Sequence, residues 1–207
     1  NRYFADNFEE CQWVTEEDWI YYKSFNIPEG FLKKKTEIKF KGIDTFSTIW
    51  LNGEKLGETS NMFREYSFDV TDYINEGEEN ELIVIINSVK DKMKDFPTDD
   101  YFACFNVSRI FLRKAQCHFG WDWAPDFPAT GIWRDIEIVS YQEAKIDNVR
   151  VETLTNGDVT FFTTFSAVDG QFNTDNEDYE ILIKISGSEK IEKKYIVTDA
   201  EDYFMIN

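Results

Sequence analysis

The sequence has 207 residues, of which 42% are hydrophobic and 17% aromatic, and its formal net charge is −18. This composition is rich enough for a buried core and excludes an intrinsically disordered chain. The negative charge disfavours nucleic acids and anionic membranes as partners, because both present phosphate groups of the same sign. A neutral ligand suits such a surface better.

Other classes are disfavoured by motifs that the sequence does not contain. No apolar run approaches the roughly 20 residues of a membrane-spanning helix, and no signal peptide is recognised, although the chain starts with Asn1 rather than Met. The three cysteines lack C-x-x-C spacing and His118 is the sole histidine, so we expect neither a metal nor a cofactor. Free thiols favour a cytoplasmic location, with secretion as the alternative.

Short β-rich segments separated by turn signals dominate the first two thirds of the chain, and this pattern is typical of a β-sandwich. Strands are predicted, in chain order, at residues 21–27, 36–40, 47–51, 54–56, 66–70, 81–87 and 131–139. Between the third and fourth strands, Asn52-Gly53 predicts a type I′ hairpin turn, since both residues tolerate positive φ. The nearly continuous apolar run at 81–87 predicts a strand buried on both faces. Residues 71–74 are expected to form a brief helical turn, and 101–118 one short helix.

The pattern changes after Tyr141, where a second, smaller sandwich of immunoglobulin type is predicted. Its strands are expected at residues 145–152, 159–165, 179–185 and 190–197, with Asn156-Gly157 as a second hairpin turn. The last residues end without a turn or cap, so this domain is expected to lack a final strand.

Trp121, Asp122 and Trp123 place a carboxylate between two indoles. One interpretation is a strand with two core tryptophans and a solvated acid. Gly120 before them and Pro125 after them favour a rigid surface loop instead. Indole rings stack on the C–H faces of pyranoses while a carboxylate accepts hydrogen bonds from hydroxyls, so such a loop has the chemistry of a sugar site. From the pattern alone, the sugar site remains the less favoured of the two.

Other chemistries find little support. His118 fits an ordinary hydrogen-bonded histidine, and the G-x-S-x-G motif that a serine hydrolase would need is absent. The chain offers no defensible pair of carboxylates for acid and nucleophile in glycoside hydrolysis. The acidic clusters near the end of the chain are better explained as solvated loops than as calcium sites.

Several motifs together resemble the N-terminal portion of glycoside hydrolase family 2 enzymes. Three are shared with the family broadly: Trp50-Leu51-Asn52-Gly53, Phe68-Asp69-Val70-Thr71 with the Tyr73-Ile74 and Gly77 that follow, and Gly131-Ile132-Trp133-Arg134-Asp135-Ile136. The stretch from Arg113 to Pro125 is similar to the β-mannosidase branch in particular. Trp19, Tyr22 and Phe25 also match the early strand of that branch.

The resemblance implies an all-β chain with two domains. Residues 1–142 would form a jelly-roll, galactose-binding-like β-sandwich without its first strands, and residues 143–207 a smaller immunoglobulin-like β-sandwich cut at its C-terminus. In the family a (β/α)₈ barrel follows and carries both catalytic glutamates of a retaining mechanism. The resemblance therefore implies that this chain holds no catalytic residue and is a piece of an exo-glycosidase acting on terminal β-mannosides.

The resemblance also assigns roles within the loop. Asp122 would contact hydroxyls of the terminal mannose, and Trp121 would form a wall of the pocket. Arg113, Lys114, His118 and Trp123 are candidates for holding the loop in place. Because a buried carboxylate costs free energy unless it is paired, we expect a hydrogen-bond donor beside Asp122.

Three alternatives stay open. The first is a family 2 enzyme of another specificity, such as a β-galactosidase or β-glucuronidase. The second is a free-standing carbohydrate-binding module. The third is an interaction domain without a sugar role, which predicts that Asp122 and its neighbouring indoles are fully packed.

Overall fold

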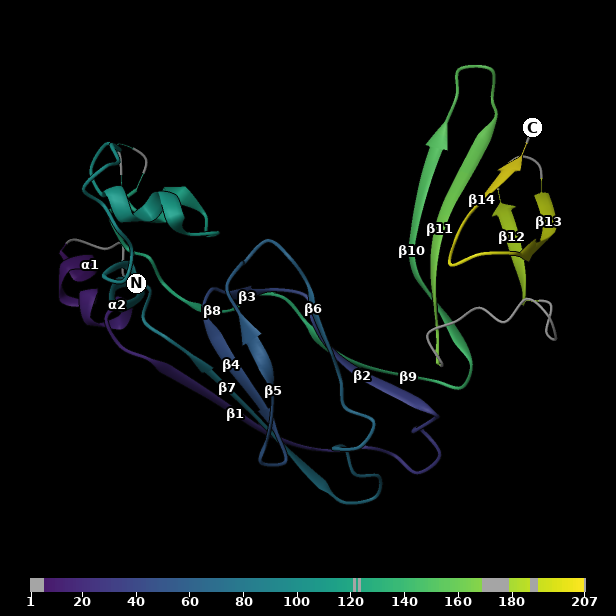
Figure 1. Ribbon diagram of the computed structural model, residues 1–207, viewed down its shortest axis with the longest axis horizontal. Coiled ribbons are helices and arrows are strands. Elements are labelled where there is room, and N and C mark those ends of the chain that lie inside the picture. The colour runs from purple at the N-terminus through teal and green to yellow at the C-terminus, as the bar shows by residue number, and fades with distance from the viewer. Residues whose placement is uncertain (1–5, 121, 123, 169–178, 187–189, 207) are drawn as a thin grey trace. The chain divides into compact units, whose positions relative to one another are not determined.

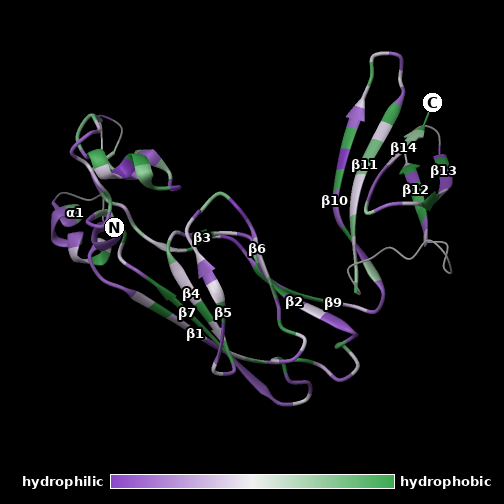
Figure 2. Cartoon of the chain, in the orientation of Figure 1, coloured by the Kyte–Doolittle hydropathy of each residue, from purple (hydrophilic) through white to green (hydrophobic). Residues whose placement is uncertain are grey.

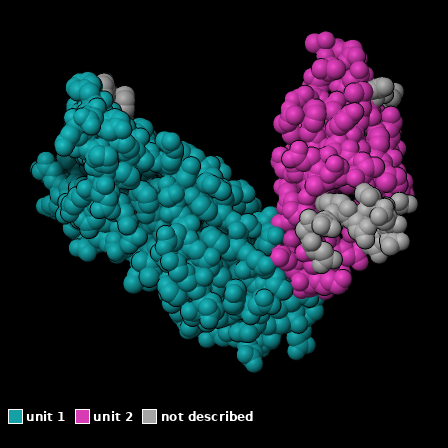
Figure 3. Space-filling model, in the orientation of Figure 1, with its two compact units in different colours: residues 1–32, 36–140 teal, residues 33–35, 141–207 magenta. Residues whose placement is uncertain are grey.

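The computed structural model describes residues 6–120, 122, 124–168, 179–186 and 190–206. The chain divides into two compact units, which Figure 3 colours separately. Unit 1 comprises residues 1–32 and 36–140, and unit 2 comprises residues 33–35 and 141–207. Strands dominate both units, as the sequence pattern predicts. Within the described residues, no helix is long and apolar enough to cross a membrane.

Unit 1 contains an antiparallel sheet of four strands, with the order β1-β7-β4-β5. Its members are β1 (Trp19–Asn26), β4 (Ser47–Leu51), β5 (Glu54–Thr59) and β7 (Glu79–Ile86). Figure 1 shows these strands side by side, with helices α1 (Asn7–Glu10) and α2 (Val89–Met93) near one end of the sheet. Short 3₁₀ helices lie at Gln12–Thr15, Val107–Phe111 and Gln116–His118.

Two smaller sheets complete unit 1. One has the order β6-β2-β9, from β6 (Tyr66–Asp69), β2 (Lys35–Phe40) and β9 (Ile136–Tyr141). The other pairs β3 (Ile43–Asp44) with β8 (Gly131–Ile132). Buried residues of these strands, of the four-stranded sheet and of adjoining segments form one core, comprising Ile27, Ile38, Phe40, Ile43, Ile49, Leu51, Val70, Ile74, Leu82, Val84 and Ile86. A β-sandwich is therefore confirmed for this part of the chain.

The Asn-Gly hairpin between β4 and β5 is confirmed, with φ of 50° at Asn52 and 87° at Gly53. The prediction for β7 is only half correct. Leu82, Val84 and Ile86 are buried, but Ile83 and Ile85 on the other face are half-buried and Glu81 is exposed. Figure 2 shows the apolar run of this strand in green. β7 therefore has one face buried in the core, while its other face is only partly covered.

The predicted strand at 131–139 is split into β8 and β9 because the chain changes partner. β8 pairs with β3, after which the amide of Trp133 donates to the carbonyl of Gly42 over 3.1 Å. The amide of Lys41 then donates to the carbonyl of Asp135 over 3.0 Å, and β9 joins the sheet of β2. Two short 3₁₀ helices replace the single helix predicted within 101–118.

The described residues of unit 2 form one sheet of three strands and one of two. The first has the order β10-β11-β14, from β10 (Ala144–Thr153), β11 (Val159–Ala167) and β14 (Glu201–Ile206), and the second pairs β12 (Tyr179–Ser186) with β13 (Lys190–Val197). Ile183, Val197, Phe204 and Ile206 form its core. β14 is not among the strands predicted from the sequence, and it pairs with β11 along its whole length. The domain boundary at 142/143 and the immunoglobulin-like topology stay predictions.

Candidate functional site

The segment from Leu112 to Phe119 is fixed to unit 1 by its apolar side chains. Leu112 and Phe119 are buried in a second, smaller core with Val89 and Met93 of α2. Ser88 caps α2 by accepting a hydrogen bond from the amide of Asp91. The residues that lead into the Trp-Asp-Trp motif therefore start from a packed base.

The loop that carries Asp122 is closed at its base by backbone hydrogen bonding. Phe119 and Asp126 form an isolated antiparallel bridge, and the amide of Phe127 donates to the carbonyl of His118 over 2.9 Å. Gly120 has φ of +85°, a left-handed backbone conformation that favours glycine. We name residues 120–125 the sugar loop, after the role that the sequence resemblance implies for them.

Asp122 is exposed within the sugar loop. We expected a hydrogen-bond donor beside Asp122 because a buried carboxylate needs a partner. Since Asp122 is exposed, the premise of burial is wrong for this chain, and a solvated carboxylate needs no protein donor. Exposure also contradicts the fully packed Asp122 that an interaction domain without a sugar role predicts. Trp121 and Trp123 lie outside the described residues.

Lys114 lies at the entrance to the sugar loop and is almost completely buried, with 1% of the residue exposed. Its Nζ forms an ion pair with Oδ2 of Asp44, whose side chain is 6% exposed, and donates to the carbonyl of Ala129 over 2.5 Å. The other carboxylate oxygen of Asp44 accepts from the hydroxyl of Thr45. One ammonium group therefore joins β3 to residues on both sides of the loop.

Burial lowers the pKa of Lys114 below its usual value, and the adjacent Asp44 carboxylate acts in the opposite direction. Removing the ammonium group from water is thus only partly offset by its partner. Burying this ion pair costs folding free energy, and the Lys114–Asp44 pair is notable for that reason.

Arg113 and His118, which are also proposed to hold the loop, contribute differently. Arg113 is exposed, and its carbonyl accepts from the amide of Met62 over 2.9 Å, so its backbone rather than its guanidinium is engaged there. His118 is half-buried, with Nδ1 at 4.0 Å from Oδ2 of Asp44. The same oxygen of Asp44 is therefore within 4.0 Å of both basic side chains that the sequence nominated at positions 114 and 118.

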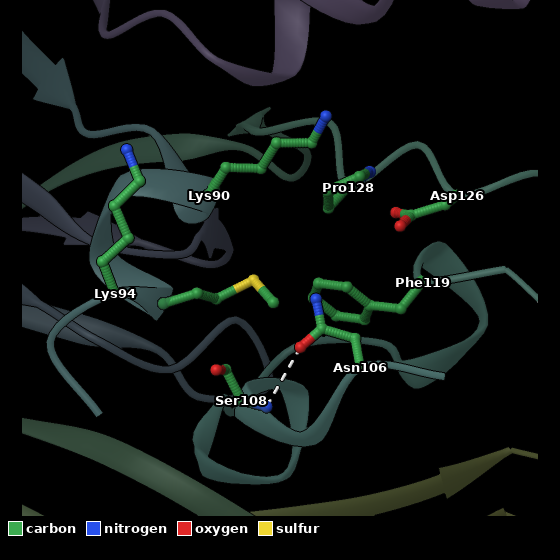
Figure 4. Close-up of a pocket in the computed structure, with 8 residues that line it drawn as sticks. Lys90, Lys94, Asn106, Ser108, Phe119, Asp126 and Pro128 are labelled. Atoms are coloured by element: carbon green, nitrogen blue, oxygen red, sulfur yellow. Dashed lines mark hydrogen bonds between the residues drawn. The ribbon is translucent and has the colours of Figure 1, made fainter. Parts of the chain in front are cut away.

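A pocket of about 260 Å³ lies beside the base of the sugar loop (Figure 4). Lys90, Met93, Lys94, Asn106, Ser108, Phe119, Asp126 and Pro128 line it. Partial burial of its carboxyl group raises the pKa of Asp126 above its usual value, and the nearby Lys90 acts in the opposite direction. Lys90 and Lys94 are already engaged, the first with Gln12 and Glu16 and the second with Asp91. The described residues hold no group of three or more metal-ligating side chains.

Sequence reasoning missed Asp44, the partner of Lys114. Seventy positions separate the two residues along the chain, and Asp44 belongs to none of the motifs quoted above. Only the pairing of β3 with β8, which brings Asp44 opposite Gly131, places this carboxylate beside the loop.

Comparison with curated proteins supports the resemblance to β-mannosidases. The chain is 31% identical over 166 residues to a β-mannosidase of Mus musculus, an alignment that covers 70% of this chain and 18% of that protein. It is 36% identical over 151 residues to β-mannosidase B of Thermothelomyces thermophilus, covering 69% of this chain and 17% of that protein. The chain thus spans less than a fifth of the length of these relatives.

Solved structures give the same result. A crystal structure of β-D-mannosidase from Dictyoglomus thermophilum superimposes with a TM-score of 0.79 at 31% identity, covering 100% of this chain and 26% of that one. A β-glucuronidase from Ruminococcus gnavus matches with a TM-score of 0.60 at 18% identity, covering 98% and 32%, and this likeness concerns the fold alone.

A family model described as glycosyl hydrolase 2 galactose-binding domain-like matches residues 1–134, which is well over half of the chain. The resemblance drawn from the sequence motifs is confirmed. The chain belongs to the glycosyl hydrolase 2 galactose-binding domain-like family and corresponds to the N-terminal region of its β-mannosidase homologues.

Proposed function

We propose that this chain is the non-catalytic N-terminal part of a β-mannosidase-like retaining exo-glycosidase, and that its sugar loop contributes to the active site. The observation that carries the proposal is the exposed Asp122 on a loop that backbone bonds close at its base. The curated relatives and the solved structure named as β-mannosidases support it. The catalytic glutamates would come from a (β/α)₈ barrel of the same polypeptide, outside this sequence.

In this proposal Asp122 binds substrate rather than breaking the glycosidic bond. An ionised carboxylate accepts hydrogen bonds only, and such charge-assisted bonds to hydroxyls are roughly twice as strong as neutral ones. Asp122 is solvated in this chain, so closing a pocket around it would transfer its hydrogen bonds from water to the sugar. Trp121 would supply an apolar wall for the C–H face of the same ring.

The remaining assignments follow from the same proposal. The second unit would be the immunoglobulin-like domain between the sugar-binding domain and the barrel. The ligand would be a non-reducing terminal β-mannoside, without a cofactor, and the location cytoplasmic. Because half a pocket supplies only part of the contacts, the isolated chain is expected to bind sugar weakly.

The experiment that tests the function is an assay of the full-length polypeptide that contains this chain. Aryl β-mannoside, β-galactoside, β-glucoside and β-glucuronide are compared as substrates, with the 207-residue chain alone as the control. The proposal expects hydrolysis of the β-mannoside by the full-length protein and none by the isolated chain. Preference for another glycoside would assign another specificity within the family, and hydrolysis by the isolated chain would contradict the non-catalytic role.

A further inference from the structure

The buried pair of Lys114 and Asp44 connects three parts of unit 1 that are far apart in sequence. Lys114 precedes the sugar loop, Ala129 follows it, and Asp44 belongs to β3. An ammonium group has three donors, and here two of them are directed to oxygens of the other two segments. The two ends of the segment from 115 to 128 are thereby joined through one ammonium group, which is itself paired with the carboxylate of Asp44.

The carboxylate is itself held in place. β3 pairs with β8, so that Asp44 lies opposite Gly131, two residues beyond Ala129. The next residue, Thr45, is completely buried, and its carbonyl accepts from the hydroxyl of Thr59 over 2.8 Å. That hydroxyl also bonds Ser47 over 2.7 Å. The residue that follows Asp44 is therefore bonded to β5, which is in turn bonded to the start of β4 in the main sheet.

A buried ion pair is weak evidence for stability, because the cost of removing two charges from water can exceed their mutual attraction. Apolar side chains of similar volume would fill the site at least as well. What the charged pair adds is direction, since Nζ meets Oδ2 of Asp44 and the carbonyl of Ala129 in one defined arrangement.

We propose that Lys114 and Asp44 form a clasp that holds the sugar loop in the position from which Asp122 meets its ligand. In this role Lys114 and Asp44 are positioning residues and touch no substrate. The inference rests on the proposed function for the identity of the ligand. The inference goes beyond the proposed function, because it attributes the position of Asp122 to a buried ion pair within the β-sandwich.

The first arm of the test measures the loop without any activity assay. Lys114→Met is combined with Asp44→Asn in the 207-residue chain, so that no unpaired charge stays buried. Amide hydrogen exchange then reports on Phe127, whose amide bonds the carbonyl of His118 at the loop base. The clasp predicts exchange at Phe127 at least tenfold faster, with the amides of β7 within twofold of the unchanged protein.

The matched control removes an ion pair from the surface. Lys55 and Glu58 are bonded over 2.7 Å with 45% and 67% of their side chains exposed. Lys55→Met with Glu58→Gln applies the same kind of chemical change and is expected to leave exchange at Phe127 unaltered. Unchanged exchange at Phe127 in the Lys114–Asp44 double variant, with β7 intact, would overturn the clasp.

The second arm of the test is a mutant cycle that combines the clasp substitutions with Asp122→Ala in the full-length enzyme. Asp122→Ala is introduced with and without the clasp substitutions, and kcat/KM is measured on an aryl β-mannoside. If the clasp acts through Asp122, its loss lowers kcat/KM at least tenfold, and Asp122→Ala then adds less than threefold. Fully additive losses would overturn the proposal. An Asp122→Ala effect that is absent even with the clasp intact would instead refute the proposed function, and the exchange arm would still decide the clasp.

Discussion

The side-chain amide of Asn52 donates to Oδ1 of Asn80 over 2.8 Å and thereby joins the hairpin turn of β4 and β5 to the start of β7. Asn80 is completely buried, and its side chain also exchanges two hydrogen bonds of 2.8 Å with the backbone of Asn75. The Oδ1 of Asn52 accepts from the amide of Glu81 over 2.8 Å. Two asparagines therefore satisfy the polar backbone at one end of the four-stranded sheet.

Asn80→Ala is expected to destabilise unit 1 by about 2–4 kcal/mol, because it removes the hydrogen bonds of this buried side chain to the side chain of Asn52 and the backbone of Asn75. Urea denaturation followed by tryptophan fluorescence measures the change. Asn26→Ala, on an exposed position of β1, is the matched control and should cost less than about 1 kcal/mol. Equal losses for the two variants would show that the Asn52–Asn80 contact contributes no stability of its own.

Lys114→Met alone is expected to destabilise the chain by about 3–5 kcal/mol, since it leaves the carboxylate of Asp44 buried without its ion-pair partner. Adding Asp44→Asn should recover most of that loss, because no charge is then buried. Both variants are compared by chemical denaturation at neutral pH. A double variant less stable than Lys114→Met would mean that the cost arises from packing of the lysine stem rather than from charge.

Asp126→Asn is expected to raise the melting temperature at pH 7 and to have a smaller effect at pH 3. Burial raises the pKa of Asp126, so this carboxyl favours the fold while protonated. Its stabilising contribution is present below the unfolded pKa and is lost as the pH rises through the folded pKa, after which the ionised group opposes folding. An amide removes that opposition.

The control for this prediction is Asp72→Asn on an exposed turn, which also removes one negative charge from a strongly acidic chain. If both variants gain the same amount at pH 7, relief of overall charge repulsion explains the effect. A gain at pH 3 that equals the gain at pH 7 would contradict the argument from the pKa of Asp126.

Gly120→Ala is expected to destabilise the base of the sugar loop by about 1–2 kcal/mol, because any side chain is strained at φ of +85°. The nearest atoms to an added Cβ lie at 3.6 Å in Asp126, so the cost comes from the backbone rather than from a clash. Faster amide exchange at Phe127 in this variant would report the effect, and unchanged exchange would contradict it.

Local signals in the sequence predict much of the fold. Asn52-Gly53 identifies the first hairpin because its geometry needs two residues that tolerate positive φ, and the strand predicted at 36–40 is present as β2, in which Ile38 and Phe40 are buried. β14 was missed although Phe204 and Ile206 alternate with exposed residues, since no turn marks its end. The five residues of α2 are too few for a helical period to show.

The candidate site divides in the same way. The Gly and Pro residues around Asp122 predict a surface loop, because their effects are local, and Asp122 is exposed. The partner of Lys114 depends on strand pairing between β3 and β8, which sequence spacing alone does not encode. Burial of the Lys114–Asp44 pair depends on the tertiary structure. It is this structure that makes Lys114, among the nominated basic residues, the one that bonds the residues on the far side of the loop.

The most direct test of the central claim is the effect of Asp122→Ala on kcat/KM for an aryl β-mannoside in the full-length enzyme, with Asp72→Ala as the control. We expect Asp122→Ala to lower kcat/KM at least tenfold, equivalent to about 1.4 kcal/mol of lost transition-state binding, with the control within twofold of the unchanged enzyme. An unchanged kcat/KM in a folded Asp122→Ala enzyme would remove this carboxylate from the substrate site and contradict the account.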